Sequence, residues 1–339
     1  MGLLSSFFLW AAPDSFFSNT IFPPPSTYDA ERDMPDQTGK VAIVTGANTG
    51  VGFETAKYLV IKNARVYACS RSEEKGRAAV EKLNAAAREK QTQGGAIWLK
   101  LDLADLDSVK EAAEEFKAKE NRLDMLFNNA GVMIPPVDQL TKQGFDLQWG
   151  TNVVGHYLFS ILLLPCLRAS FAATGVPPRV VQTSSSGNQM APGPTGFVPD
   201  SLHDGVKRDE VIKKWGATQG TWNLYGQSKL GNVFVANILQ DLLGEEGVSM
   251  CAHPGGLKTE LQRTTPGWQL LLMNWMLNPA YMGAWTQLWG ATSPEGANFQ
   301  KKFLYPWARI GKSDPRGQNP ETLKEVKAHL DKEIAPWVN

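Results

Sequence analysis

A strand, a glycine-rich turn and a helix follow one another between residues 40 and 59, and this succession limits the possible fold more than any other stretch. Residues 40–45 are mostly apolar and β-branched, which is typical of a strand buried in a parallel sheet. The turn contains Gly46, Gly50 and Gly52, and the residues after it have helical spacing. The first glycine permits a tight turn, the second lets the backbone approach a pyrophosphate, and the third lets helix and strand pack closely. We predict a pyrophosphate site here; the alternative is a glycine-rich turn without a ligand.

The rest of the chain continues this alternation of strands and helices. Further strands are expected at 64–69, 96–103, 123–127, 180–183, 248–252 and 303–305. Further helices are expected at 73–89, 152–167, 206–215, 225–242, 280–297 and 321–334. This order predicts an α/β protein with a single-domain Rossmann fold, a doubly wound parallel sheet with helices on both faces. Residues 1–37 are predicted to form an N-terminal arm and residues 38–339 the Rossmann-type domain.

Composition narrows the possible functions. Lysine plus arginine and aspartate plus glutamate both total 34, and this balance argues against a general nucleic-acid binder. Cys69, Cys166 and Cys251 are dispersed and lack metal-ligand spacing, so we predict buried free thiols, no metal and a reducing, cytoplasmic setting. No apolar run reaches the roughly 18 residues of a membrane span, so no transmembrane helix is predicted.

The N-terminal arm allows three interpretations. Residues 3–10 form a short apolar block with no basic residue before it, which disfavours a secretory signal. The block could be an interfacial anchor, and Gly2 with Ser6 fits the short pattern for N-myristoylation. The third interpretation is an arm folded onto the domain surface, with the prolines at 23–25 as a spacer. Peripheral membrane contact through the arm therefore stays open.

A tyrosine and a lysine on one predicted helix come after a strand that ends in serines. Tyr225 and Lys229 are close to one helical turn apart and therefore share a face. A phenol, with an ordinary pKa of about 10, needs help to trade protons near neutral pH, and a nearby ammonium favours the phenolate. Ser185, in the loop after the strand at 180–183, can hold a substrate oxygen. The alternative is a packed tyrosine beside a solvated lysine.

Six motifs stand in order along the chain. They are the glycine turn with Gly-x-x-x-Gly-x-Gly spacing, Asn128-Asn129-Ala130-Gly131, Asn152, Ser185, Tyr225-x-x-x-Lys229 and Pro254-Gly255. In this order they resemble the short-chain dehydrogenase/reductase family, over residues 38–312. The glycine turn, the end of the second strand and the His253-Pro-Gly segment look most like the retinol dehydrogenase and WW-domain oxidoreductase-like branch. The proline-containing arm looks like that of fungal members.

The resemblance implies a nicotinamide dinucleotide at the carboxyl ends of the strands. The cofactor residues that it implies are Gly46, Asn48, Thr49, Gly50, Val51, Gly52, Asp102, Leu103, Asn129, Ala130, Gly131, Tyr225, Lys229, Pro254, Gly255, Leu257 and Thr259. At the end of the second strand, Ser70 stands where NAD-selecting enzymes carry an acid for the ribose 2′-hydroxyl. Arg71 can pair with a 2′-phosphate, so Ser70 and Arg71 predict NADP(H). A solvated arginine at a strand end is the alternative for Arg71.

The resemblance also implies a reaction, hydride transfer between C4 of the nicotinamide and the carbon of a carbonyl or alcohol. Tyr225 would give or take the proton, Ser185 would orient the oxygen, and Lys229 would hold the ribose and lower the tyrosine pKa. Asn152, the fourth catalytic residue, would bend its helix, and its backbone carbonyl would hold a water linked to Lys229. His156, on the same helix, is predicted to be a packed or surface histidine rather than a catalytic one.

Two segments are expected to form the substrate pocket. Residues 187–224 are a long insertion between Ser185 and Tyr225, in which Trp215, Trp222 and Leu224 could line a wall or simply pack. Residues 260–280 match the family's substrate flap, and their apolar character suggests a lipophilic or ring-containing small molecule. A homodimer patch or a membrane-facing surface would explain the same apolar residues.

Two other functions compete with an oxidoreductase. A non-catalytic NADP-binding regulator would keep the fold, but such proteins usually lose the catalytic residues that this chain retains. An extended-type epimerase or dehydratase shares Tyr-x-x-x-Lys, but its glycine turn has another spacing and its C-terminal domain is larger. We therefore predict an NADP(H)-dependent oxidoreductase acting on a ketone, an aldehyde or the corresponding alcohol, with reduction as the expected direction.

Overall fold

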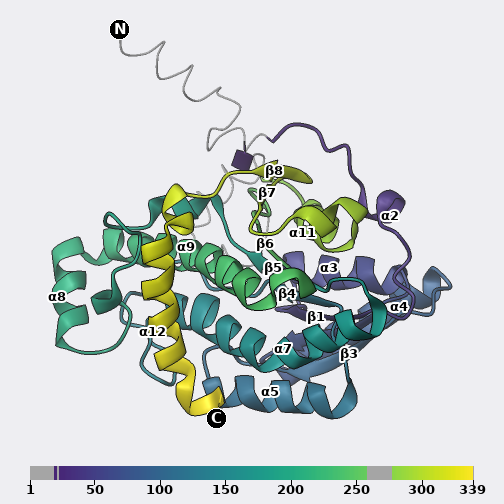
Figure 1. Cartoon of the computed structure of the whole chain (residues 1–339), viewed down its shortest axis with the longest axis horizontal. Coiled ribbons are helices and arrows are strands. Elements are labelled where there is room, and N and C mark those ends of the chain that lie inside the picture. The colour runs from purple at the N-terminus through teal and green to yellow at the C-terminus, as the bar shows by residue number, and fades with distance from the viewer. Residues whose placement is uncertain (1–18, 21–22, 258–276, 339) are drawn as a thin grey trace, which may run out of the picture.

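The strand before the glycine-rich turn, β1 (Val41–Thr45), lies inside an eight-stranded sheet. The computed structural model describes residues 19–20, 23–257 and 277–338, and in it the strand order is β3-β2-β1-β4-β5-β6-β7-β8 (Figure 1). All pairs from β3 to β7 are parallel, and β8 runs antiparallel to β7. The chain winds outward from β1 through β2 and β3, then returns to β4 on the other side. Such a switch point opens a crevice at the carboxyl ends of the strands.

The remaining strands and the helices alternate along the chain. The strands are β2 (Arg65–Ser70), β3 (Gly95–Lys100), β4 (Met125–Asn128), β5 (Arg179–Thr183), β6 (Val248–Ala252), β7 (Phe303–Tyr305) and β8 (Arg309–Gly311). The helices are α2 (Ala30–Asp33), α3 (Gly50–Ile61), α4 (Glu73–Glu89), α5 (Leu106–Lys119), α6 (Leu147–Trp149), α7 (Gly155–Thr174), α8 (Val206–Trp215), α9 (Ala217–Leu243), α11 (Ala280–Thr292) and α12 (Pro320–Val338). A π-helical turn, Gly150–Val154, joins α6 to α7.

Helices cover both faces of the sheet, and each face has its own apolar core. Helices α2, α3, α4 and α11 lie on one face, and α5, α7, α9 and α12 lie on the other (Figure 1). The inner strands β1, β4, β5 and β6 are buried along their whole length, as a parallel sheet between two helix layers requires. The predicted α/β class with a doubly wound sheet is confirmed.

Helix α5 and strand β8 were not predicted, and several predicted bounds differ from those of the structure. The three residues of β8, with Ile310 exposed, carry no apolar strand pattern. The helix predicted at 280–297 ends at Thr292, because Pro294 lacks the N–H that an α-helix needs. Helix α9 begins at Ala217, after Gly216 with φ +76°, so its first turns include the last residues of the insertion predicted at 187–224. Trp222 and Leu224 therefore belong to the helix that carries Tyr225.

One helical stretch of the described chain, Leu147–Thr174, is long and apolar enough to cross a membrane by length and composition. In the structure it is part of the core. Tyr157, Leu158 and Leu163 are fully buried among the side chains of the α5, α7 and α9 layer. The stretch also carries buried polar groups, Asn152 and His156, that are used in the site described below.

The described part of the N-terminal arm lies against the face of the sheet that α3 and α11 cover. Tyr28, Ala30 and Met34 are buried in the core of that face. Farther back, the Thr20 carbonyl accepts a hydrogen bond of 2.7 Å from the Gly256 N–H. The predicted anchor and acylation site, with Gly2 and Ser6, lie outside the described residues.

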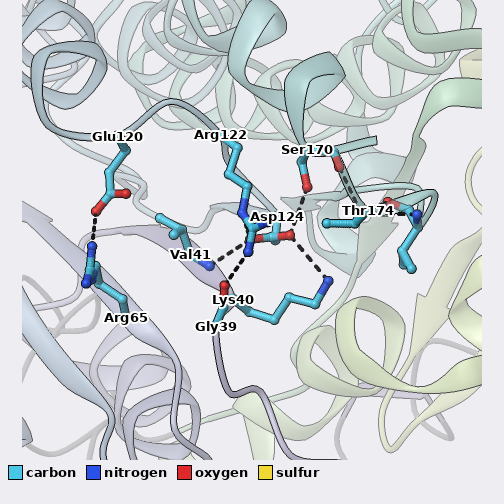
Figure 2. A network of polar contacts seen from close by, with 10 residues as sticks. Gly39, Lys40, Val41, Arg65, Glu120, Arg122, Asp124, Ser170 and Thr174 are labelled. Atoms are coloured by element: carbon cyan, nitrogen blue, oxygen red, sulfur yellow. Dashed lines mark hydrogen bonds and ion pairs between the residues drawn. The ribbon is translucent and has the colours of Figure 1, made fainter. Parts of the chain in front are cut away.

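A buried carboxylate joins the elements at the amino-terminal edge of the sheet (Figure 2). Asp124, 4 % exposed, accepts hydrogen bonds from the Val41 N–H at 2.8 Å, the Ser170 hydroxyl at 2.8 Å and the Lys40 ammonium at 3.3 Å. The Arg122 guanidinium lies 3.6 Å away. One side chain thus ties β1 to β4 and to α7, at the edge opposite the glycine-rich turn.

Replacing this carboxylate should cost stability. In Asp124→Asn the amide has the shape of the carboxylate but no negative charge. Its NH₂ group would face the Val41 N–H, the Ser170 hydroxyl or the Lys40 ammonium, which are themselves donors. We expect the free energy of unfolding to fall by about 3 kcal/mol, the scale for breaking a buried ion pair. Urea denaturation followed by circular dichroism measures it. The matched control is Asp200→Asn, whose exposed pair with Lys207 should contribute less than about 1 kcal/mol. Equal stability of the two variants would contradict this role.

Candidate active site

Four parallel strands end side by side at the carboxyl edge of the sheet. Strand β1 ends at Thr45, β4 at Asn128, β5 at Thr183 and β6 at Ala252. The loops after these strands carry the glycine turn, the Asn-Asn-Ala-Gly segment, Ser185 and the Pro-Gly segment. Helix α9 brings Tyr225 and Lys229 to the same edge, since it packs on β5 and β6. The topology therefore gathers the predicted residues at the switch point.

The glycine turn is shaped by two close contacts. Gly46 has φ +68°, a left-handed conformation that favours glycine. A Cβ at Gly52, in the first turn of α3, would overlap the Gly46 carbonyl oxygen and the Asn129 amide nitrogen. Glycine at both positions therefore lets α3 start directly above β1.

The first turn of α3 presents unpaired N–H groups to the crevice. Asn48, Thr49 and Val51 are half-buried around this turn. Thr49 is the N-cap residue, and its side chain makes no capping hydrogen bond with the described residues. Uncapped N–H groups and the positive end of the helix dipole attract an anion, so the helix start suits a pyrophosphate.

The two residues at the end of β2 differ in what they can offer a ligand. The Ser70 hydroxyl donates to the Ser72 carbonyl at 3.3 Å and accepts from the Trp98 indole N–H at 3.1 Å. Arg71 is exposed, and within the described part of the chain its guanidinium makes no ion pair. Arg71 therefore keeps its donors for a ligand, whereas Ser70 uses its hydroxyl inside the protein.

Asp102 and Leu103 follow β3 and border the crevice. The Asp102 carboxylate accepts a 3.0 Å hydrogen bond from the Ala104 N–H, as an acid in a loop commonly does. Leu103 is buried, and a Cβ at Gly155 would lie 2.5 Å from its carbonyl oxygen. The start of α7 is thus packed tightly against the loop after β3.

The segment after β4 is held by the last residue of β1. The Thr45 hydroxyl oxygen accepts hydrogen bonds of 2.9 Å from the Asn129 and Ala130 N–H groups. The Asn129 side chain donates to the Thr45 carbonyl, also at 2.9 Å. A Cβ at Gly46 would lie 3.1 Å from Ala130, so this segment runs along the glycine turn.

Asn152 lies in the π-helical turn and is fully buried. Its side-chain amide pairs with the Val132 backbone, accepting from the N–H at 2.8 Å and donating to the carbonyl at 3.0 Å. Its own carbonyl accepts from His156 Nδ1 at 3.0 Å and from Asn232 Nδ2 at 2.7 Å. A carbonyl oxygen has two lone pairs. Two side chains thus hydrogen-bond the carbonyl that is expected to hold a water linked to Lys229, and that water stays a prediction.

Ser185 and Tyr225 both lie beside Gly187. Ser185 caps a short 3₁₀ turn, and its hydroxyl accepts from the Gly187 N–H at 3.1 Å. Tyr225 is 8 % exposed, and a Cβ at Gly187 would lie 3.5 Å from the Ser185 hydroxyl oxygen. A Cβ at Gly187 would lie 2.8 Å from the Tyr225 ring, so only glycine admits the ring here without a shift.

Lys229 is buried beside the other catalytic candidates. Its ammonium donates to the Thr183 carbonyl at 3.1 Å and lies 5.9 Å from the centre of the Tyr225 ring. A Cβ at Gly131 would be 3.1 Å from the Asn152 side-chain oxygen and 3.5 Å from this ammonium. The structure therefore brings Asn152, Ser185, Tyr225 and Lys229 to one place.

Burial, rather than charge, sets the acid–base properties of this pair. It lowers the pKa of Lys229 to about 8 and raises the pKa of Tyr225 above its ordinary value, while the nearby Ser185 hydroxyl acts in the opposite direction on the tyrosine. The lowering of the tyrosine pKa by Lys229 belongs to the expected mechanism and stays a prediction.

The Pro-Gly segment follows β6. Gly255 has φ +89°, and a Cβ there would lie 3.0 Å from the Trp307 ring. Pro254 lies beside α11, since a Cβ at Gly283 would be 3.3 Å from its carbonyl oxygen. Leu257 is buried and pairs with Asn278 in a parallel bridge. Thr259 and most of the predicted flap, residues 260–276, lie outside the described residues.

Of the three residues predicted for a pocket wall, one has its ring against that of Tyr225. Trp222 is 36 % exposed, and its ring meets that of Tyr225 edge to face at 6.3 Å. Leu224 is buried and faces away from solvent, and Trp215 is half-buried at the end of α8. Met190, which was not predicted, is exposed next to Gly226.

Three residues that hold the site were not singled out for that role: Thr45, His156 and Asn232. Thr45 could have been predicted from its place at the end of the strand, directly before Gly46. Asn232 could have been predicted because it follows Lys229 by less than one helical turn and shares its face of the helix. His156 was expected to be packed or on the surface, and it is fully buried.

Comparison with known proteins decides the family. The family model for short chain dehydrogenase matches residues 40–195. A short-chain dehydrogenase/reductase of Armillaria gallica is 45 % identical over 312 residues, which cover 92 % of this chain and 95 % of that protein. The chain belongs to the short-chain dehydrogenase/reductase family. Both the predicted family and the predicted likeness to fungal members are confirmed.

Other relatives agree with this membership in a family of oxidoreductases. An uncharacterised oxidoreductase of Schizosaccharomyces pombe is 39 % identical, with coverage of 78 % of this chain and 75 % of that protein. Among solved structures, an uncharacterised protein of Mycobacterium paratuberculosis is similar with a TM-score of 0.63 and 26 % identity, covering 91 % of this chain and 97 % of that one. RhlG of Pseudomonas aeruginosa, solved with NADP, shares the fold with a TM-score of 0.60 and 22 % identity, covering 79 % and 94 %.

The lowered pKa of Lys229 predicts a pH-dependent stability. Between pH 8 and its ordinary pKa of 10.5 the unfolded chain binds a proton that the folded chain does not, so stability should rise with pH in this window. Relative to Lys229→Met, which lacks the group, the wild type should gain about 3 kcal/mol of unfolding free energy across it. Urea denaturation of both proteins at several pH values measures the difference. A difference that stays constant with pH would show that the lysine keeps its ordinary pKa.

Proposed function

We propose that this member of the family is an NADP(H)-dependent oxidoreductase that reduces the carbonyl group of a ketone or aldehyde, or oxidises the corresponding alcohol. The observation that carries the proposal is the arrangement of Tyr225, which lies with Ser185 beside Gly187 and has the buried Lys229 ammonium 5.9 Å from its ring centre. This group stands at the crevice where a doubly wound sheet binds its ligand.

The residues at the switch point fit a dinucleotide. The glycine turn leaves no room for a Cβ at Gly52, and the uncapped first turn of α3 offers N–H groups to a pyrophosphate. When bound, the nicotinamide supplies or receives the hydride. Arg71 would hold the 2′-phosphate of NADP(H), because its guanidinium is exposed and Ser70 replaces the acid that would favour NAD.

The acid–base state of the site favours reduction. Because burial raises the pKa of Tyr225, the phenol holds its proton at neutral pH and can donate it from Oη to the oxygen of the reduced carbonyl. Lys229, with a pKa of about 8, is charged at neutral pH and stabilises the phenolate once that proton has left. Ser185, which lies with Tyr225 beside Gly187, would orient the substrate oxygen.

The surface next to Tyr225 suits a lipophilic or ring-containing substrate. The exposed side chains of Trp222 and Met190 flank this part of α9 and offer apolar contacts to a ligand. The apolar flap predicted from the sequence at 260–280 follows the Pro-Gly segment and would add to the same surface.

Removing the phenolic hydroxyl should abolish turnover. In Tyr225→Phe the ring remains but the proton donor is lost, so we expect NADPH-dependent reduction to fall at least about a thousandfold. Binding of NADPH, followed by its fluorescence, should change little. A panel of aldehydes and ketones, from retinal-like to polycyclic, supplies the substrates, with NADPH oxidation followed by absorbance.

The matched control is Tyr67→Phe, in which the lost hydroxyl is bonded to Glu120. It should keep wild-type turnover. If Tyr225→Phe reduced carbonyl substrates as fast as this control, the assigned chemistry would be wrong. If the wild type bound NADPH but turned over no member of the panel, the result would favour a non-catalytic NADP-binding protein.

Arg71 should decide the choice between NADPH and NADH. A charge-assisted hydrogen bond contributes about 1.5–3 kcal/mol, so Arg71→Ala should raise the KM for NADPH by roughly 10- to 100-fold and leave the KM for NADH nearly unchanged. Arg65→Ala, at the opposite end of β2, is the control because Arg65 pairs with Glu120. A wild-type protein that uses NADH as well as NADPH would refute the role of Arg71.

A further inference from the structure

A closed ring of hydrogen bonds surrounds the segment Asn129–Val132. At its start, the Asn129 and Ala130 N–H groups donate to the Thr45 hydroxyl. At its end, both backbone groups of Val132 pair with the Asn152 amide. His156 completes the ring, because its Nε2 lies 2.8 Å from the Thr45 hydroxyl and its Nδ1 lies 3.0 Å from the Asn152 carbonyl oxygen.

The hydrogen-bond partners fix the state of the imidazole. A carbonyl oxygen can only accept, so Nδ1 of His156 must carry a hydrogen. Burial, together with the charge of Lys229, lowers the pKa of His156 to about 4, so the ring is neutral near pH 7. Nε2 is then bare and accepts the hydrogen of the Thr45 hydroxyl. The Thr45 oxygen uses its two lone pairs for the two N–H groups, and every member of the ring is satisfied.

A charged imidazole would not fit this ring. The Thr45 hydroxyl could instead donate to the Phe127 carbonyl, at 3.3 Å, but that contact is longer than the 2.8 Å to His156. An Nε2–H would then be a third donor to an oxygen that has two lone pairs and already accepts from two N–H groups. The neutral Nδ1–H tautomer is the one that the geometry supports.

The enclosed segment touches both halves of the site. On one side Ala130 lies against the glycine turn, where a Cβ at Gly46 would come within 3.1 Å. On the other side Gly131 lies against the Lys229 ammonium, where a Cβ would come within 3.5 Å. A displacement of this segment would therefore change both the cofactor cradle and the surroundings of Lys229.

We propose that His156 is a positioning residue, a neutral Nδ1–H imidazole that ties the end of β1 to the π-helical turn of Asn152 and thereby fixes the segment Asn129–Val132 between the cofactor turn and Lys229. The effect on turnover rests on the proposed function. The ring of hydrogen bonds, the tautomer and the order of the segment do not.

The tautomer can be observed directly. In protein labelled with ¹⁵N-histidine, long-range ¹H–¹⁵N spectra at neutral pH should show an Nδ1-protonated, neutral histidine whose signal vanishes in His156→Asn and persists in His203→Asn. A signal of His156 with the proton on Nε2, or on both nitrogens, would overturn the proposal whether or not the protein is an enzyme.

Variants at both ends of the imidazole test the positioning. In His156→Asn, the amide can keep a donor near the place of Nδ1, but the hydrogen bond from the Thr45 hydroxyl to position 156 is lost. In His156→Gln, the amide can reach the Thr45 hydroxyl, but the hydrogen bond to the Asn152 carbonyl is lost. We expect each to weaken NADPH binding about tenfold, the scale of one hydrogen bond, and to speed hydrogen exchange of the Asn129 and Ala130 amides. His203→Asn, an exposed histidine, is the control and should change neither.

The partner of the bond supplies the rescue test. Thr45→Val removes the hydroxyl, whereas Thr45→Ser keeps it and should retain wild-type affinity and exchange. In the Thr45→Val background, His156→Asn should add little, because the bond between the two side chains is already lost. Folded His156→Asn protein with wild-type exchange at Asn129 and Ala130 would refute the positioning role. A wild type that binds NADPH without reducing any carbonyl would refute the proposed function alone.

Discussion

Backbone groups that leave a parallel sheet at its carboxyl edge lose their ladder partners, and satisfying them is the constraint on which the rest of this structure depends. Side chains take over the task. The Thr45 hydroxyl receives two N–H groups of the segment after β4, the Asn152 amide pairs with Val132, and the Lys229 ammonium binds the Thr183 carbonyl. The groups that stabilise this edge are therefore the same groups that build the site.

The burial that makes these bonds strong also sets the chemistry. A buried phenol and a buried amine both resist ionisation, so Tyr225 keeps its proton and Lys229 loses its own more easily than in water. In the folded protein, the neutral forms of Tyr225 and Lys229 are therefore favoured more than they would be in a pair exposed to water. Negative charge on the carbonyl oxygen during reduction would meet a protonated phenol with an ammonium behind it, the combination that a proton donor requires.

The fold was largely predictable, because long apolar strands, the glycine turn and the order of motifs all point to one doubly wound sheet. The residues gathered around Tyr225 were predictable for the same reason, since parallel strands bring their carboxyl ends together. What depended on packing was not predictable. Strand β8 has no apolar pattern, and α9 starts inside a polar stretch at Ala217. The pKa of Tyr225 follows from its burial, and the Asn152 carbonyl is filled by Asn232 from another helix, neither of which local spacing reveals.

The Asp124 cluster lies at the amino-terminal edge of the sheet, away from all of this chemistry. It connects β1, β4 and α7 without using any group of the carboxyl edge. The loops beyond Thr183 and Ala252 can therefore change in length and composition while the strands stay anchored from behind. The polar network of Figure 2 thus keeps the anchoring of the strands separate from the loops that border the candidate site, so a change in those loops would leave the network intact.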